Sequence, residues 1–127
     1  MTVVMLVEDS HEDRYFARRI LRKLDKSCDV IEFEYVDDAL SHLKTPGRKP
    51  IDVIIADINM PKLTGFDFVD AFGDLYSELK GGARVFLASH SINPRDRDRA
   101  EAHPVVEGYL EKPLRREQLA TILAPDD

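Results

Sequence analysis

Three carboxylates follow two apolar runs of the chain. Glu8 and Asp9 come directly after residues 3–7, and Asp57 comes directly after residues 53–56. Because neither run alternates polar with apolar residues, we interpret both as central strands of a parallel sheet, covered on both faces. A carboxylate at the end of such a strand is costly unless a cation or hydrogen bonds hold it. Oxygen ligands at an open site suit Mg²⁺ or Mn²⁺, so the three acids predict a metal site.

A hydroxyl and an ammonium group follow two other strand-like runs. Ser89 ends residues 84–89, and Lys112 follows residues 105–110, directly before a proline. Taken singly, each of these side chains could instead lie in solvent or begin a helix. Together, a metal ion and a lysine can neutralise phosphoryl oxygens while a carboxylate attacks in line. The combination predicts phosphoryl transfer onto Asp57.

The rest of the chain alternates strand-like and helical stretches. The expected strands are 3–7, 30–35, 53–56, 84–89 and 105–110, and the expected helices are 12–24, 37–43, 65–79, 94–103 and 114–123. Strict alternation predicts an α/β fold, a doubly wound five-stranded parallel sheet with helices on both faces. The second and fifth strands are half polar, which is typical of edges. The flavodoxin-like order 2-1-3-4-5 has these edges and brings the ends of its first and third strands together.

Two helices differ in how much they can bury. The helix over 12–24 has an apolar face formed by Phe16, Ile20, Leu21 and Leu24. The helix over 94–103 carries a run of alternating arginine and aspartate and offers only Ala100 and Ala102 to a core. We therefore expect the second of these helices to be weakly anchored and easily moved.

Composition restricts the class of protein. The chain has 127 residues, 43% of them hydrophobic, which fits one domain over residues 1–127 with no output domain. A formal net charge of −6 argues against direct binding of nucleic acid and against anionic membranes. The single cysteine excludes an internal disulfide and favours the cytoplasm. We expect no membrane insertion, because no apolar run approaches the length of a transmembrane helix.

The sequence resembles the receiver domains of two-component response regulators from residue 3 to residue 123. The matching residues are Val7-Glu8-Asp9, Asp57-Ile58-Asn59-Met60-Pro61, Gly65, Ser89, Tyr109 and Lys112-Pro113. Residues 91–96 are similar to the same segment of stand-alone, single-domain members.

The resemblance implies a role for each matching residue. Asp57 would accept phosphate from a phosphohistidine on a sensor histidine kinase or a histidine phosphotransfer protein. Asp9, Asp57 and the backbone carbonyl of Asn59 would bind Mg²⁺, with Glu8 acting mainly through water. Lys112 would contact the phosphoryl group.

The resemblance also implies a switch. Ser89 would move toward the phosphoryl group, and Tyr109 would follow from an outward to an inward position. Separately from the resemblance, Ser89 and Lys112 are expected beside the weakly anchored helix over 94–103, so we hypothesise that the fourth helix, fifth strand and fifth helix form an output face. This face would control a protein partner, or the protein would pass phosphate along a relay. The kinase would dock on the first helix near residues 13–17.

One position departs from the family pattern. The residue after the switch hydroxyl is usually small, but here it is His90. Its ring can narrow access to the phosphoryl group or hydrogen-bond to it, so the lifetime of the phosphorylated state does not follow from the resemblance. Ser91 remains an alternative to Ser89 as the responding hydroxyl.

Three other functions are compatible with parts of the pattern. A haloacid-dehalogenase-like phosphatase also uses a nucleophilic aspartate with Mg²⁺, but needs a second aspartate where this chain has Asn59. A binding module of receiver fold would ignore phosphate altogether. A nucleotide-binding flavodoxin-like protein would need a glycine-rich loop after the first strand, which the sequence lacks.

Overall fold

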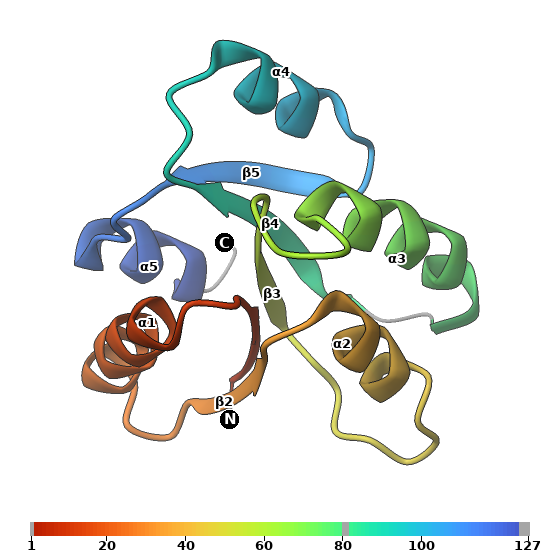
Figure 1. The fold of residues 1–127 in the computed structure, drawn as a ribbon. Helices are drawn as coiled ribbons and strands as arrows, with labels where there is room; N and C mark the ends of the chain where they lie inside the picture. The colour runs from red at the N-terminus through yellow and green to blue at the C-terminus, as the bar shows by residue number, and fades with distance from the viewer. Residues whose placement is uncertain (1, 80–81, 125–127) are drawn as a thin grey trace.

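The computed structural model of the protein describes residues 2–79 and 82–124, apart from the side chains of residues 76–79. Within these residues, five parallel strands form one sheet in the order β2-β1-β3-β4-β5, with five helices around it (Figure 1). The elements in chain order are β1 Val3–Val7, α1 His11–Leu24, β2 Asp29–Phe33, α2 Val36–Leu43, β3 Val53–Asp57, α3 Gly65–Leu79, β4 Arg84–Ser89, α4 Pro94–Ala102, β5 Val106–Glu111 and α5 Arg116–Leu123. The predicted fold class and strand order are confirmed.

The central strands are apolar on both sides because each side meets a helical layer. β1 and β3 are buried along their whole length. Val4 and Leu6 pack with residues of α1 and α5, whereas Met5 and Val7 pack on the opposite side with residues of α2, α3 and α4. Figure 1 shows α1 and α5 together on one face of the sheet. The two cores hold the ends of β1 and β3 in fixed register, Val7 beside Ala56.

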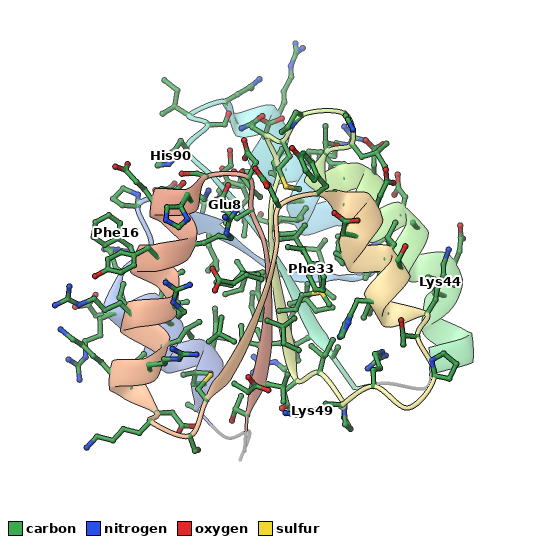
Figure 2. All side chains as sticks on the ribbon, turned by 60° about the horizontal axis from the view of Figure 1, so that its bottom comes forward. Glu8, Phe16, Phe33, Lys44, Lys49 and His90 are labelled. Carbon is green, nitrogen blue, oxygen red and sulfur yellow. The ribbon has the colours of Figure 1, made fainter. Side chains whose placement is uncertain are left out.

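The apolar face predicted for α1 is partly wrong. Ala17 and Leu21 are the buried residues of this helix, and Ile20 and Leu24 pack at the edge of the same core. Phe16 is 57% exposed and lies on the outer side of α1 (Figure 2). The reason is geometric. Ala17 and Leu21 are four residues apart and share the face of α1 that packs in the core, so the neighbouring Phe16 is turned towards solvent.

The helix beside β5 buries one residue, as the sequence predicts, and its weak anchoring stays a prediction. Ala100 is the buried residue of α4, and Asn93 caps the helix by accepting a hydrogen bond from the backbone N–H of Arg95 at 3.0 Å.

α5 begins at Arg116, two residues later than predicted, because Arg115 has an extended backbone and its N–H donates to Gln118 Oε1 at 2.8 Å. Among the described residues, none of the helices combines the length and the apolar character of a transmembrane span.

Candidate functional site

The acidic side chains converge at the carboxyl ends of β1 and β3. Glu8 and Asp9 follow β1, and Asp57 is the last residue of the neighbouring β3. Oxygen atoms from the three carboxylates lie within 4.8 Å of one another. Glu8 and Asp57 are buried. Carboxylate oxygens at this spacing fit a hard divalent cation, so the cluster could hold a metal ion.

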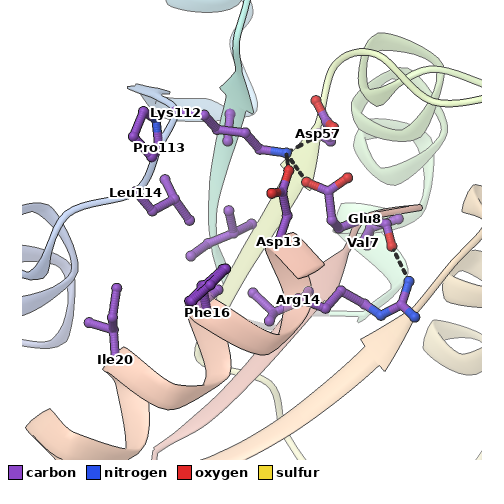
Figure 3. Close-up of a pocket in the computed structure, with 14 residues that line it drawn as sticks. Val7, Glu8, Asp13, Arg14, Phe16, Ile20, Asp57, Lys112, Pro113 and Leu114 are labelled. Atoms are coloured by element: carbon purple, nitrogen blue, oxygen red, sulfur yellow. Dashed lines mark hydrogen bonds and ion pairs between the residues drawn. The ribbon is translucent and has the colours of Figure 1, made fainter. Parts of the chain in front are cut away.

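Lys112 reaches this cluster from the end of β5. Its Nζ lies 2.9 Å from Asp57 Oδ2 and 3.0 Å from Asp13 Oδ2, and it also contacts Glu8 Oε1 (Figure 3). The lysine side chain is only 4% exposed, and the Lys112–Pro113 peptide bond is cis. The strands therefore bring together an ammonium group and carboxylates that are far apart in the sequence.

Burial shifts the pKa values of Asp57 and Lys112. Burial raises the pKa of Asp57 to about 6, with smaller contributions from the nearby charges of Asp9 and Asp13, although the backbone N–H of Asn59 opposes this by donating to Asp57 Oδ1 at 3.1 Å. Burial lowers the pKa of Lys112 to about 8. Both shifts disfavour the charged forms, and a bound cation would favour the ionised carboxylate.

The Ser89 hydroxyl lies beside Asn59. Ser89 Oγ accepts hydrogen bonds from Asn59 Nδ2 at 3.0 Å and from the backbone N–H of Ser91 at 2.8 Å, and the residue is 1% exposed. With both acceptor positions of the oxygen occupied, its O–H remains available as a donor. The Ser91 hydroxyl instead accepts from the backbone N–H of Asn93 at 3.1 Å, within the loop that leads to α4.

Two aromatic rings flank the site. His90 is exposed, and its Nε2 lies 3.4 Å from Asp13 Oδ2, so the ring points towards α1. Figure 2 shows His90 and Glu8 at the same end of the sheet. Tyr109 is partly buried, donates its hydroxyl hydrogen to the Ser91 carbonyl at 3.3 Å, and has the Arg97 guanidinium 5.7 Å from its ring centre.

Sequence reasoning missed two residues of α1 that support the site. Asp13 contacts Lys112, as described above. Arg14 donates from Nη1 to the Glu8 carbonyl oxygen at 2.6 Å and lies 3.5 Å from Glu32 Oε1, which ties the loop after β1 to β2 (Figure 3). One signal was available, since Ser10 begins the helix and Asp13 is the acid three residues later, in its first turn.

A glycine allows α3 to start against the site. A Cβ atom at Gly65 would lie 2.4 Å from the carbonyl oxygen of Asp57, closer than real Cβ atoms approach. The backbone N–H of Gly65 donates to the Ile58 carbonyl at 3.1 Å. The matching glycine is therefore required by close backbone contact at the end of β3.

Comparisons with known proteins agree with this geometry. The profile of the response regulator receiver domain matches residues 4–124. Two-component response regulator ARR6 of Arabidopsis thaliana is 32% identical in an alignment of 121 positions that covers 88% of this chain and 62% of that protein. Sensor histidine kinase CheAY of Helicobacter pylori is 29% identical over 121 residues, 95% of this chain and 14% of that protein. The chain thus spans less than two thirds of the length of these curated relatives.

The fold also superposes on a solved structure of a response regulator. The crystal structure of a two-component response regulator from Cytophaga hutchinsonii superposes with a TM-score of 0.83 at 29% identity, covering 96% of this chain and 93% of that one. With the profile match over nearly the whole sequence, this shows that the chain belongs to the receiver domain family of two-component response regulators.

Proposed function

We propose that Asp57 accepts a phosphoryl group from a phosphohistidine of a sensor histidine kinase or a histidine phosphotransfer protein. The observation that supports this most directly is the 2.9 Å contact between Lys112 Nζ and Asp57 Oδ2 beside the acidic cluster. In the transfer, the phosphorus–nitrogen bond of the donor breaks and phosphorus bonds to a carboxylate oxygen of Asp57. Receiver domains are generally not catalytic enzymes. Here the protein would promote its own phosphorylation and dephosphorylation.

The side chains around Asp57 have distinct parts in this proposal. Glu8, Asp9, Asp57 and the backbone carbonyl of Asn59 would hold Mg²⁺, with Mn²⁺ as an alternative. The ion would supply positive charge against the phosphoryl oxygens. Lys112 would donate N–H groups to the same oxygens, and Ser89 would donate its free O–H.

The donor would approach over α1. An apolar pocket of about 340 Å³ opens beside Asp57 and Lys112, between α1 and the segment that follows β5. Phe16 and Ile20 line it on one side, and Leu114 on the other (Figure 3). An exposed aromatic ring next to a pocket of this kind is typical of a protein contact. This supports docking of a phosphohistidine-bearing protein at α1. The encounter would take place in the cytoplasm.

The signal would leave through α4, β5 and α5. Ser89 and Lys112 lie at the ends of β4 and β5, and the Tyr109 hydroxyl is bonded to the loop between β4 and α4. Since α4 buries little apolar surface, a small change in the contacts of Ser89, Lys112 and Tyr109 would be enough to move it. The moved face would control a downstream protein target, or the phosphate would be passed along a relay.

Phosphate uptake is the decisive experiment. We expect the protein to gain the mass of one phosphoryl group in acetyl phosphate and Mg²⁺, measured on the intact chain. Asp57→Asn should abolish the gain, and Asp37→Asn, an exposed acid in the first turn of α2, should not. No mass gain in the wild-type protein would favour the phosphate-independent binding module. Turnover of a phosphomonoester would instead favour a phosphatase.

The proposed switch has a separate test. Hydrogen exchange is compared with and without beryllofluoride, a mimic of the phosphoryl group. We expect protection to change over residues 94–112 in the wild-type protein but not in Asp57→Asn. Unchanged protection across this segment in the wild-type protein would refute the switch. A pull-down with and without the mimic would then identify the target.

A further inference from the structure

Lys112 has one partner that the proposed phosphorylation does not use. Its Nζ contacts the carboxylates of Glu8, Asp57 and Asp13, the last at 3.0 Å (Figure 3). An ammonium group has three N–H donors, so these carboxylates occupy all of them. When Asp57 is phosphorylated, the N–H that it held can pass to the phosphoryl group. Lys112 can donate to a second phosphoryl oxygen only after it gives up Glu8 or Asp13.

Asp13 is the partner that costs least to release. Its side chain is 31% exposed, compared with 9% for Glu8 and 8% for Asp57. A buried carboxylate that loses its cation has no water to replace it, which is strongly unfavourable. Asp13 can turn to solvent, and it keeps a second partner because His90 Nε2 lies 3.4 Å from the same oxygen.

The fold holds Asp13 in this position. Its backbone N–H donates to Ser10 Oγ at 3.2 Å, which fixes the first turn of α1 opposite the end of β5. Its negative charge lies close to Asp57, because Asp13 Oδ2 and Asp57 Oδ2 are 3.0 Å and 2.9 Å from the same Lys112 Nζ. Asp13 thus adds negative charge where an anionic phosphodonor must approach.

We propose that Asp13 is a positioning residue that holds the Lys112 ammonium group in the unphosphorylated protein and releases it to the phosphoryl group on Asp57. The second half of this statement rests on the proposed function. Removing the carboxylate should free Lys112 and favour phosphorylation. Glu12→Gln is the matched control, because Glu12 is an exposed acid in the same helical turn.

The first test needs neither metal nor phosphodonor. Lysines of the full chain are acylated with N-hydroxysuccinimidyl acetate, and the rate at Lys112 is read by peptide mass spectrometry. In Asp13→Asn we expect this rate to rise on the order of fivefold, since a partly exposed charge-assisted hydrogen bond is lost. Glu12→Gln should leave the rate unchanged, and Asp13→Glu should restore protection. An unchanged rate in Asp13→Asn overturns the proposal.

The second test measures phosphorylation by acetyl phosphate at saturating Mg²⁺. We expect Asp13→Asn to be phosphorylated on the order of fivefold faster than the wild-type protein and Glu12→Gln, matching the freed lysine. If Asp13→Asn is acylated faster at Lys112 but is phosphorylated no faster than the wild-type protein, the proposed release of Lys112 to the phosphoryl group is wrong. If neither the wild-type protein nor any variant takes up phosphate, but acylation of Lys112 is still faster in Asp13→Asn, the proposed function fails while the role of Asp13 in holding Lys112 stands. Circular dichroism checks folding, and Asp13→Ser replaces an unfolded Asp13→Asn.

Discussion

Replacing Gly65 with alanine tests how closely α3 approaches Asp57. The new Cβ would lie 2.4 Å from the Asp57 carbonyl oxygen and 2.9 Å from its carbonyl carbon. Both are backbone atoms, so no side-chain rotation can relieve the overlap. The backbone is also tied on each side, since the Ile58 N–H donates to the Ala88 carbonyl at 2.9 Å and the Gly65 N–H donates to Ile58. The start of α3 must therefore move, and Asp57 with it.

The expected loss follows from the size of that overlap. Overpacking costs about 1–3 kcal/mol, and the gain in helix propensity from glycine to alanine offsets at most about 1 kcal/mol. We expect the free energy of unfolding to fall by about 1–2 kcal/mol, which lowers Tm by roughly 5 °C. A shift of Asp57 by about 1 Å should also slow phosphorylation by up to about a hundredfold.

Urea unfolding and acetyl phosphate uptake measure the two effects separately. Gly82→Ala is the control, because a Cβ there would meet no atom within 4 Å. We expect that variant to keep the wild-type rate and to be unchanged or more stable by about 0.5 kcal/mol. If Gly65→Ala unfolds at the wild-type urea concentration and is phosphorylated at the wild-type rate, the argument from close approach is wrong.

Two further predictions concern stability. The folded-state pKa of Asp57, about 6, lies above its ordinary value of 3.8, so this group should lower the stability of the metal-free protein as pH rises from about 4 to 6. The free energy of unfolding of Asp57→Asn, measured in urea, should therefore rise by about 1–3 kcal/mol relative to that of the wild-type protein between pH 4 and pH 6. A difference between the two proteins that does not change with pH would contradict the raised pKa. Phe16→Ser should change the free energy of unfolding by less than about 0.5 kcal/mol, since the ring is exposed, whereas Leu21→Ala should cost about 2–5 kcal/mol. Equal losses would place Phe16 in the core.

The sheet could be predicted because burial differs between its strands. β1 and β3 need apolar residues on both sides, whereas the edge strand β2 carries Glu32, which pairs with Arg18 of α1 at 2.5 Å. This contrast reveals the edges, and the flavodoxin-like order 2-1-3-4-5 is a common doubly wound order that has these edges. The convergence of Glu8, Asp9 and Asp57 follows from that order, because parallel strands end at the same rim.

The supporting contacts could not be predicted in the same way. An apolar helical stripe shows that α1 faces a sheet, but not which row within the stripe is in contact, so Phe16 and Ala17 could not be distinguished. The ion pair between Asp13 and Lys112 joins residues 99 apart in the sequence and depends on the tilt of α1. No local pattern records such a contact.

The surface of α4 is largely independent of the core. Ala100 is its buried residue, and most of the other side chains of the helix, including Arg95 and Asp98, lie in solvent. Substitutions at those positions cost little folding free energy. A duplicated copy of this gene can therefore change the surface of α4 while the acidic cluster and Lys112 are inherited unchanged.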